Sequence, residues 1–485
     1  MKLSLAGHIT PEDKQSSDYA YVPFDLSEPT NSLSVRYSYS APISSDEREG
    51  GNVIDIGLFD PRGMDFPGGS GFRGWSGSAR KEFTISTTRA TPGYLPGPLP
   101  AGRYHIVLGL YRIWPQGADY EIAVSVGEGP SRSTAPAPAQ AQKTVRQPPP
   151  PRTDVSPVWL RGDLQSHTNH SDAKGTLSQL VSRARDLMLD FLAVTDHNTV
   201  SHHPYLTDVA DESLLLIPGQ EATSYYGHLN IWGTSRWCDF RCRDDDDMAA
   251  VIDLAHSHGG LCSINHPKTG GPAWEYSPDL PVDAIEAWQG PWPWRNEQSL
   301  ALWEELLTSG RRLTAVGGSD YHCPAGAETS LLRLGQPTTW VKSAGRSIDD
   351  ILDAIRSGRV SISALPIGPF LEMSAVQDGE AAGMGEELAI TAGEPVQLIA
   401  KIEHGAGWVL RCIADGAIVR EITVKDDPAE LRVAVTAKTY VRAELVGDAP
   451  PEIIPENVPI PIDPRGWRWA LTNPIYIRPL EKQTG

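Results

Sequence analysis

A proline-rich stretch divides the chain and limits what it can fold into. Residues 128–157 contain eight prolines, four of them consecutive at 148–151, and no aromatic residue, leucine or isoleucine. Such a segment lacks the side chains that a core requires and favours an extended, semi-rigid backbone. We therefore expect a linker with separately folded parts on either side of it.

The part before the linker, residues 1–127, has the pattern of β-strands. Large apolar residues recur at every second position over 104–110 and over 120–126, which is the period of a strand with one buried face. Gly/Pro-rich turns such as FPGGSGFRG separate these runs. The pattern predicts an N-terminal β-sandwich.

After the linker, residues 158–366 alternate between apolar strand-like runs and amphipathic helices. Thr176 and Gln179 have the spacing of a capping box at the start of one helix, and further helices are expected near 248–258 and 297–309. This alternation predicts the α/β fold class with a mostly parallel sheet, either a barrel or a doubly wound layer. Residues 367–485 return to strand alternation and predict a C-terminal β-sandwich-like domain.

Composition excludes several classes of protein. The chain has 42 Lys and Arg against 61 Asp and Glu, a net charge of −19, which argues against a surface that coats nucleic acid or anionic membrane. No apolar run approaches the ~18 residues that a membrane span needs, and the first residues are too polar for a secretory segment. Five cysteines do not suggest a disulfide scaffold. We expect a cytoplasmic protein that does not associate with membranes, and the sequence does not predict its oligomeric state.

Histidine is concentrated in the α/β part, where ten of the 13 lie between positions 167 and 322. Many of them, with several carboxylates, fall where a predicted strand ends, and in parallel α/β folds these ends form the functional rim. Imidazole and carboxylate without cysteine are ligands that suit Zn, Mn or Fe. The polar residues gathered at these strand ends are Gln165, His167, Asp172, Asp196, His197, Glu221, His228, His266, Asp320 and His322.

The ordered motifs of this part resemble those of the PHP (polymerase and histidinol phosphatase) superfamily. GDLQSHTNHSDAKGT is similar to its first motif, D-L-H-x-H-T-x-x-S-D-G, and LDFLAVTDH, PGQE, INHP and GGSDYH are similar to the later ones. The ending WALTNPIYIR resembles the CehA/McbA-type metallohydrolases. The resemblance implies an irregular (β/α)7 barrel that binds one to three divalent metal ions.

The resemblance also implies how the ligands are shared among the metals. By position, the first metal takes His167, Glu221 and Asp320, the second takes Glu221 as a bridge with His228 and His266, and the third takes Asp172, His197 and His322. These eight are the candidate metal residues.

The first motif departs from the family pattern at two positions. Gln165 stands where the motif has its leading histidine, and Ala173 stands where it usually has glycine. An amide oxygen is a poorer ligand than imidazole for these metals. Gln165 is therefore either a weak ligand of the first metal or a residue that orients water or substrate.

Other residues near these motifs are candidates for catalysis or substrate binding. Asp196 either orients an imidazole, ligates a metal or acts as a base, and we favour the first role. Lys268 either holds an anionic oxygen of the substrate or forms a surface ion pair. Substrate contact is also considered, against ordinary loop packing, for His170, His202, His203 and Trp288.

Three other features have simpler explanations. His256 and His258 suit the C-terminal end of a helix, and the acidic run 244–247 suits a helix start. Cys238 and Cys242 lack the second ligand pair of a zinc knuckle.

Three functions are compatible with these features. The leading hypothesis is a metal-dependent hydrolase of phosphoesters, acting on a small-molecule ester or on nucleic acid only as a short or terminal substrate. The second keeps the metal site but cleaves a carbamate or carboxylic ester. The third is a non-catalytic module that binds through its β domains and retains a degenerate barrel, and Gln165 is its only support.

Overall fold

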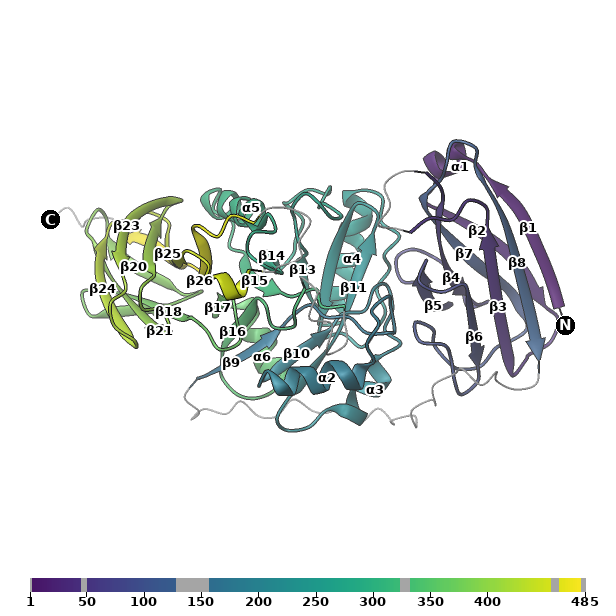
Figure 1. Cartoon of the computed structure of the whole chain (residues 1–485), viewed down its shortest axis with the longest axis horizontal. Helices are drawn as coiled ribbons and strands as arrows, with labels where there is room; N and C mark the ends of the chain where they lie inside the picture. Colours follow the sequence, from purple (N-terminus) through teal and green to yellow (C-terminus); the bar gives the residue numbers. More distant parts are fainter. Residues whose placement is uncertain (1, 45–49, 128–156, 323–331, 455–461, 481–485) are drawn as a thin grey trace.

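The computed structural model describes residues 2–44, 50–127, 157–322, 332–454 and 462–480. Three parts follow one another along the long axis of the molecule, with the N-terminal β part at one end and the C-terminal strands at the other (Figure 1). The predicted linker at 128–157 lies outside the described residues except for Pro157. The α/β part is in the middle and contacts both neighbours.

The N-terminal part consists of two four-stranded antiparallel sheets, with strand orders β1-β8-β3-β6 and β2-β7-β4-β5. The four residues predicted to face the core, Tyr104, Ile106, Leu108 and Leu110, are all buried in the core of this part. The opposite face of the strand is not left exposed, because Val107 is buried against a second cluster. Its elements are β1 (Lys2–Ile9), α1 (Pro11–Ser16), β2 (Tyr19–Leu26), β3 (Ser32–Tyr39), β4 (Val53–Phe59), β5 (Phe72–Gly77), β6 (Glu82–Ser86), β7 (Gly102–Arg112) and β8 (Ala118–Gly127).

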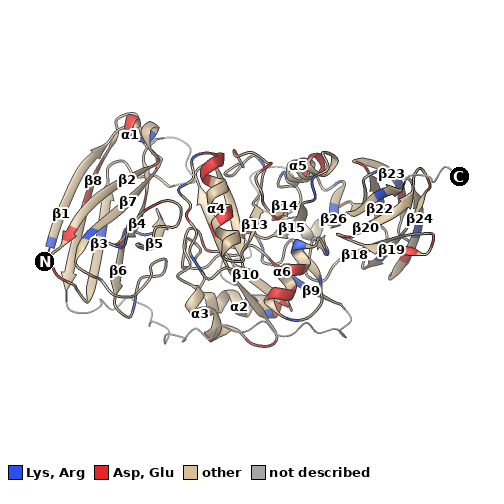
Figure 2. Cartoon of the chain, turned by 180° about the vertical axis from the view of Figure 1, so that it is seen from behind, with Lys and Arg blue, Asp and Glu red and all other residues tan. Residues whose placement is uncertain are grey.

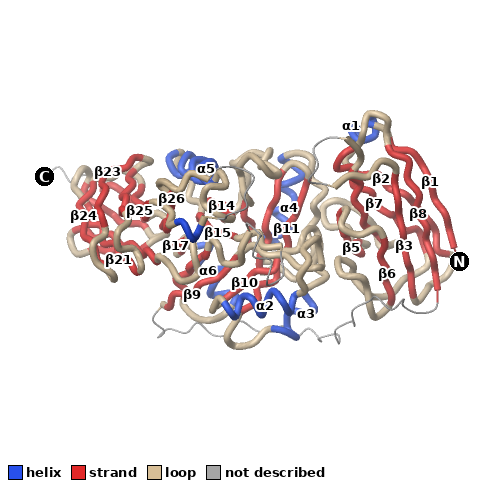
Figure 3. The backbone as a smooth tube through the Cα atoms, viewed as in Figure 1, coloured by secondary structure: helices blue, strands red, loops and turns tan. Residues whose placement is uncertain are grey.

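The central part has mixed α/β structure. Helix α2 starts with the predicted capping box of Thr176 and Gln179. The elements are β9 (Val158–Asp163), α2 (Leu177–Asp186), β10 (Phe191–Val194), α3 (His203–Val209), β11 (Leu215–Ser224), β12 (Gly227–Trp232), α4 (Asp245–Ser257), β13 (Leu261–Ile264), β14 (Ala284–Gln289), α5 (Asn296–Thr308), β15 (Thr314–Gly318), β16 (Thr338–Ser343), α6 (Ile348–Arg356) and β17 (Val360–Ser363). Helices α2 and α3 lie on one side of the strands and α5 on the opposite side (Figure 3).

The central sheet is mixed, whereas the sequence predicts a mostly parallel one. Strands β9, β10 and β11 are parallel to one another, as are β13, β14 and β15. Strand β12 pairs antiparallel with both β11 and β13, because a tight turn at Tyr225 and Tyr226 reverses the chain. Strand β16 pairs antiparallel with β9, and β17 pairs antiparallel with β16.

Strands β15 and β16, far apart in the strand order, lie close together. The hydroxyl of Thr339 on β16 accepts a hydrogen bond from the amide of Gly317 on β15 at 2.9 Å and donates to the carbonyl of Gly317 at 2.8 Å. This contact is made by a side chain, since β15 pairs through its backbone with β14 alone among the described strands. The irregular (β/α)7 barrel therefore stays a prediction.

Some of the C-terminal strands extend the central sheet, and others form a sheet of their own. Strand β26 pairs antiparallel with β17, and the side chain of Asn473 bonds to the backbone of both Ala315 and Val360. A separate antiparallel sheet has the order β19-β18-β21-β24. The elements are β18 (Phe370–Gln377), β19 (Glu380–Gly383), β20 (Glu387–Thr391), β21 (Val396–Glu403), β22 (Val409–Ala414), β23 (Ala417–Thr423), β24 (Ala429–Val435), β25 (Tyr440–Gly447), η1 (Pro451–Ile453), β26 (Trp467–Thr472) and β27 (Ile475–Leu480).

Acidic side chains gather on helices of the central part. Figure 2 shows Asp and Glu along α4 and α6, whose first turns contain Asp245–Asp247 and Asp349–Asp350. Among the described residues, no helix combines the length and apolar character that crossing a membrane requires.

Candidate metal centre

The candidate metal residues come from six strands of the central sheet and the loops that follow them. His167 and Asp172 follow β9, His197 follows β10, and His266 follows β13. Glu221 and His228 lie within β11 and β12 rather than after them, because the hairpin between these strands extends past the other strand ends. Asp320 and His322 follow β15.

Two of these residues have an unusual backbone conformation. His266 has φ 28° and Asp320 has φ 53°, in the left-handed region that non-glycine residues rarely adopt. The amide of His266 donates to Oε2 of Glu286 at 2.8 Å, and the amide of Asp320 donates to the carbonyl of Gln165 at 3.0 Å. These bonds hold the two side chains at the centre despite the backbone strain.

Glu221 is fully buried in the middle of the cluster. Its Oε1 lies 3.1 Å from Nδ1 of His228 and 3.4 Å from Nε2 of His266. Its Oε2 lies 2.9 Å from Nδ1 of His197 and 3.4 Å from Nε2 of His167. One carboxylate thus faces four imidazoles, two on each oxygen.

The remaining candidates lie beside this group. Nε2 of His167 is 3.0 Å from Oδ1 of Asp320, and Oδ1 of Asp172 is 3.3 Å from Nε2 of His322 and 3.6 Å from Nε2 of His197. Three sets of possible ligand atoms lie within 4.8 Å of one another, namely His167–Glu221–Asp320, His197–Glu221–His228 and His167–His197–His322. The structure therefore brings all eight candidate metal residues together.

Several buried polar atoms in the cluster form no well-directed hydrogen bond among the described residues, even where an oppositely charged group lies within 3.4 Å. They include Nε2 of His167, Oε2 of Glu221 and Oε1 of Gln165. A buried polar atom without a partner costs free energy, so such atoms in a native fold call for an explanation. A divalent cation would satisfy the nitrogen and carboxylate oxygen at once, and the residues present therefore fit a metal ion.

The charges within the cluster are strongly coupled. Burial lowers the pKa of His197, but Glu221 and Asp172 outweigh it and raise the pKa to about 9. Burial likewise opposes protonation of His322, whose pKa nevertheless rises to about 10 beside Asp320 and Asp172. In the metal-free protein these imidazoles hold protons that balance the carboxylates, so a metal ion has to displace protons on binding.

Three further polar residues support the cluster, and the sequence analysis missed them. Asn265 donates to Oε1 of Glu221 at 2.9 Å, and Gln289 donates to Oδ2 of Asp320 at 3.2 Å. Glu286 is buried, and burial raises the pKa of its carboxyl well above the ordinary value. The signal in the sequence for Glu286 was an acidic residue inside the apolar run AIEAWQG. Gln289 is the last residue of the same strand, so its position at a strand end was its signal.

Gln165 contacts both central carboxylates. Its Nε2 donates to Oε1 of Glu221 at 3.0 Å and to Oδ1 of Asp320 at 3.2 Å. The residue therefore lies at the cluster, where it fixes the two acids through its amide group.

Asp196 does not have the position that our favoured role requires, which was beside an imidazole of the metal cluster. Its Oδ1 accepts from the amide of Thr168 at 2.8 Å and from the hydroxyl of Ser171 at 2.7 Å, and its Oδ2 lies 3.0 Å from Nδ1 of His202. His202 is not among the candidate ligands. Asp196 thus holds the loop after β9 and pairs with a histidine outside the cluster.

The histidines considered for substrate contact are engaged by the protein. Nδ1 of His170 is 2.8 Å from Oγ of Ser201, and Nε2 of His202 is 3.1 Å from the carbonyl of Val194. Nε2 of His203 is 2.8 Å from the carbonyl of Gly219. These contacts favour positions within the protein over contact with a substrate.

Lys268 and Trp288 are also buried, and neither is a surface residue. Nζ of Lys268 donates to the carbonyl of Gln289 at 2.8 Å and to Oδ1 of Asn296 at 2.9 Å, which excludes the surface ion pair. Burial lowers the pKa of Lys268 to about 7. The indole nitrogen of Trp288 donates to the carbonyl of Gly290, and its ring lies in the core against Trp292. This placement favours packing over a wall of a substrate pocket.

A second His/Cys/Asp group lies away from the centre. His256, Cys262 and Asp283 also offer three ligand atoms within 4.8 Å. Oδ2 of Asp283, however, already accepts from the amide of Cys262 at 2.8 Å and lies 2.8 Å from Nε2 of His256, and burial keeps the pKa of the Cys262 thiol well above its usual value. The group is explained by these bonds without a metal.

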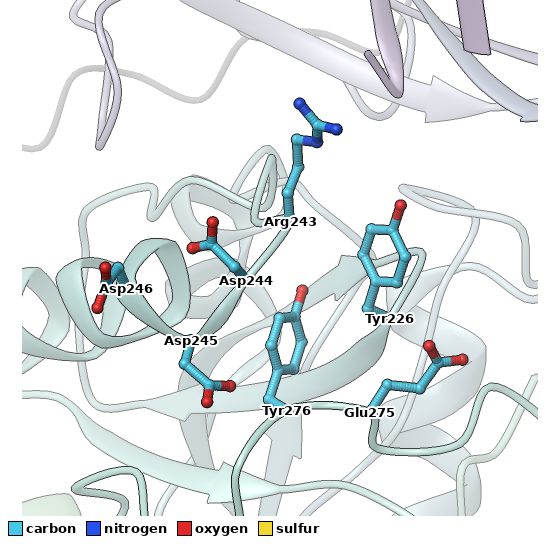
Figure 4. Close-up of a pocket in the computed structure, with 7 residues that line it drawn as sticks. All are labelled: Tyr226, Arg243, Asp244, Asp245, Asp246, Glu275 and Tyr276. Atoms are coloured by element: carbon cyan, nitrogen blue, oxygen red, sulfur yellow. The ribbon is translucent and has the colours of Figure 1, made fainter. Parts of the chain in front are cut away.

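An open cavity of about 470 Å³ lies at the start of α4, where Figure 4 shows the side chains that line it. None of these residues is a candidate metal residue. Asp244 caps the helix as predicted for the acidic run, by accepting from the amide of Asp247 at 3.0 Å. The lining residues are Tyr226, Arg243, Asp244, Asp245, Asp246, Glu275 and Tyr276.

No protein-family model matches the chain, and no curated protein matches it either. Among solved structures, it is similar to a crystal structure described as a two-domain protein containing a predicted PHP-like metal-dependent phosphoesterase, from Bacteroides vulgatus ATCC 8482. The two are 17% identical with a TM-score of 0.37, over 68% of this chain and 99% of the other. This chain therefore has a distant structural match to a predicted PHP-like protein, together with histidine-rich clusters that suit a metal.

Proposed function

We propose that this chain is a metal-dependent hydrolase that cleaves phosphoester bonds, as a CehA/McbA-type member of the PHP superfamily with an irregular (β/α)7 barrel. One observation carries the proposal, namely the buried carboxylate of Glu221 with two imidazoles facing each of its oxygens. One to three ions of Mn, Zn or Fe would be held by His167, Asp172, His197, Glu221, His228, His266, Asp320 and His322.

The chemistry follows from what such a centre supplies. Divalent ions in a site of this kind activate water at neutral pH and stabilise the negative charge that develops on the substrate. The protein's own contribution is to fix the ligands. Gln165 and Asn265 hold Oε1 of Glu221, and Gln289 holds Asp320. Such supporting contacts keep ligand carboxylates in place and tune the affinity for the metal.

A second candidate function, hydrolysis of a carbamate or carboxylic ester, is favoured by the position of Lys268. Binding of an anionic oxygen was one of two roles considered for this ammonium group, but it is buried and donates to Gln289 and Asn296. A neutral ester does not require a cationic side chain at the site, whereas a phosphate gains from one.

Metal analysis followed by a substrate panel tests the proposal. The protein is stripped with a chelator, reloaded with Mn²⁺ or Zn²⁺, and assayed with a nitrophenyl phosphodiester, a nitrophenyl phosphomonoester and an aryl carbamate, beside an identically treated Glu221→Gln variant. Turnover of a phosphoester by the reloaded wild type alone supports the leading function. Turnover of the carbamate alone favours the second, and failure to bind any of these metals favours a non-catalytic module.

A further inference from the structure

The N-terminal β part touches the loops that carry the candidate metal residues. The amide of Gly93 donates to Oγ of Ser201 at 3.0 Å, and the hydroxyl of Thr199 donates to the carbonyl of Gly93 at 3.0 Å. Gly93 has φ 96°, and a Cβ there would lie 2.9 Å from the carbonyl oxygen of His170. The backbones are therefore in direct contact, with no room for a side chain between them.

Arg80, in the turn between β5 and β6, reaches into the loop after β9. Its Nη1 donates to the carbonyl of Ser171 at 2.8 Å, and its Nη2 donates to the carbonyl of Asn169. The guanidinium group is partly buried there. A planar group with several N–H donors can hold two carbonyls in a fixed relation, which the single ammonium of a lysine does less well.

The same loop is held from its other side by Asp196. That carboxylate accepts from the amides of Thr168 and Ser171, at 2.8 Å and 3.1 Å, while Arg80 takes the carbonyls of Asn169 and Ser171. The loop backbone is therefore fixed between an acid of the central part and a base of the N-terminal part.

The loop leads directly to Asp172, whose side chain is 50% exposed. The other candidate carboxylates, Glu221 and Asp320, are fixed by the amide groups of Gln165, Asn265 and Gln289. Asp172 contacts Nε2 of His322 and of His197 at 3.3 and 3.6 Å, so its place beside them depends on the backbone that Arg80 and Asp196 hold.

We propose that Arg80 is a positioning residue of the metal centre, through which the N-terminal β part sets the loop that brings Asp172 to His197 and His322. This inference rests on the proposed function, since it treats these three residues as ligands of one metal. It gives the N-terminal part a role in metal binding, which the sequence did not assign to it.

A double-mutant cycle tests the proposal in the full-length protein. Arg80→Met removes the hydrogen-bond donors but keeps the aliphatic stem, and Asp172→Asn removes the charge of the ligand. A double variant combines the two substitutions. Stripped proteins are titrated with Zn²⁺ against a chromogenic chelator. We expect Arg80→Met to weaken one class of site by about tenfold, the scale seen when a group that supports a ligand is lost. In the Asp172→Asn background the same change should have no further effect, because Arg80 acts through Asp172.

The matched control is Arg103→Met, which removes an exposed arginine of the same β part that pairs with Asp25. It should leave Zn²⁺ affinity unchanged. If Arg80→Met lowers Zn²⁺ affinity equally in the wild-type and Asp172→Asn backgrounds, Arg80 has a general structural role and the proposal is overturned. An unchanged Zn²⁺ affinity in Arg80→Met would overturn it as well.

Amide hydrogen exchange of the metal-free protein separates this inference from the proposed function. Arg80→Met should speed exchange at residues 168–172 relative to wild type, whether or not the wild type binds Zn²⁺. Unchanged exchange there would overturn the positioning role. Absence of Zn²⁺ binding by the wild type, with faster exchange in Arg80→Met, would instead contradict the proposed function and leave Arg80 as an anchor of the loop. Arg80→Lys provides a second variant in case Arg80→Met folds poorly, and we expect it to restore affinity only in part.

Discussion

The side-chain amide of Gln165 donates to Oε1 of Glu221 at 3.0 Å. The amide donates to two carboxylates while its own oxygen has no partner among the described residues. Gln165 thus holds in place two of the acids that we propose as ligands of the first metal.

Replacing this residue tests whether its position is a ligand position. We expect Gln165→His to raise Zn²⁺ affinity about tenfold, because imidazole is a better ligand than an amide for a borderline metal. Competitive titration of the stripped protein measures this change. An unchanged affinity and stoichiometry would show that Gln165 acts only as a hydrogen-bond donor to Glu221 and Asp320.

Glu221 and Glu286 form a matched pair for testing the central carboxylate. Glu221→Gln should lose at least two metal equivalents together, because the carboxylate faces imidazoles on both oxygens. Glu286→Gln should keep the wild-type stoichiometry, because burial raises the pKa of Glu286 well above its usual value and an amide replaces a neutral acid. Elemental analysis of both dialysed variants provides the comparison, and loss of metal from both to the same extent would refute the central role of Glu221.

Removal of the metal should destabilise the fold. Nε2 of His167 and Oε2 of Glu221 form no well-directed hydrogen bond, and an ion bound only in the folded state would satisfy both atoms. Zn²⁺ at 100 times its dissociation constant should add about 2.7 kcal/mol to the free energy of unfolding. Thermal unfolding with and without a chelator measures the effect, and Glu221→Gln should show no such difference. If Zn²⁺ raises the unfolding temperature of both proteins equally, the metal binds outside the cluster around Glu221.

The contact between Asp55 and Tyr225 predicts a pH dependence of stability. Oδ2 of Asp55 on β4 accepts from the hydroxyl of Tyr225, in the turn between β11 and β12, at 2.7 Å. Burial raises the pKa of Asp55 from 3.8 to about 6. The folded state favours the protonated acid. The contribution of Asp55 to the free energy of unfolding is therefore fully present below pH 4 and is lost as the pH rises through 6.

Asp55→Asn should remove this dependence. Between pH 4 and pH 7, the free energy of unfolding of the variant should rise by on the order of 3 kcal/mol relative to that of the wild type, since each pKa unit corresponds to about 1.4 kcal/mol. Chemical denaturation at several pH values measures the difference. The exposed Asp426→Asn variant serves as the control, and a stability difference that does not change with pH would disprove the assignment to Asp55.

Local sequence signals predicted individual elements well. The capping box at Thr176 begins α2, and the apolar residues at alternate positions of β7 are buried. Both features could be predicted because each pattern depends on neighbouring residues alone. The candidate metal residues also come together, since strand ends of one sheet meet on one side of it.

Contacts between distant parts of the chain could not be predicted in this way. Nothing near Arg80 or Gly93 in the sequence indicates that they touch the loops at 168–171 and 199–202. The burial of Lys268 and Trp288 likewise depends on how β14 and α5 pack, since Asn296 at the start of α5 accepts from Lys268. The antiparallel β12 makes the sheet mixed, although its apolar run looks like that of any buried strand.

The pairing of β26 with β17 has a consequence for attempts to shorten the protein. A chain cut at residue 366 would lose β26 and leave the backbone N–H and C=O groups of Val360–Ser363 unpaired along one side. Unpaired strand edges of this kind recruit other chains. The C-terminal strands thus shield the central sheet from self-association, and a trimmed protein should precipitate rather than remain in solution.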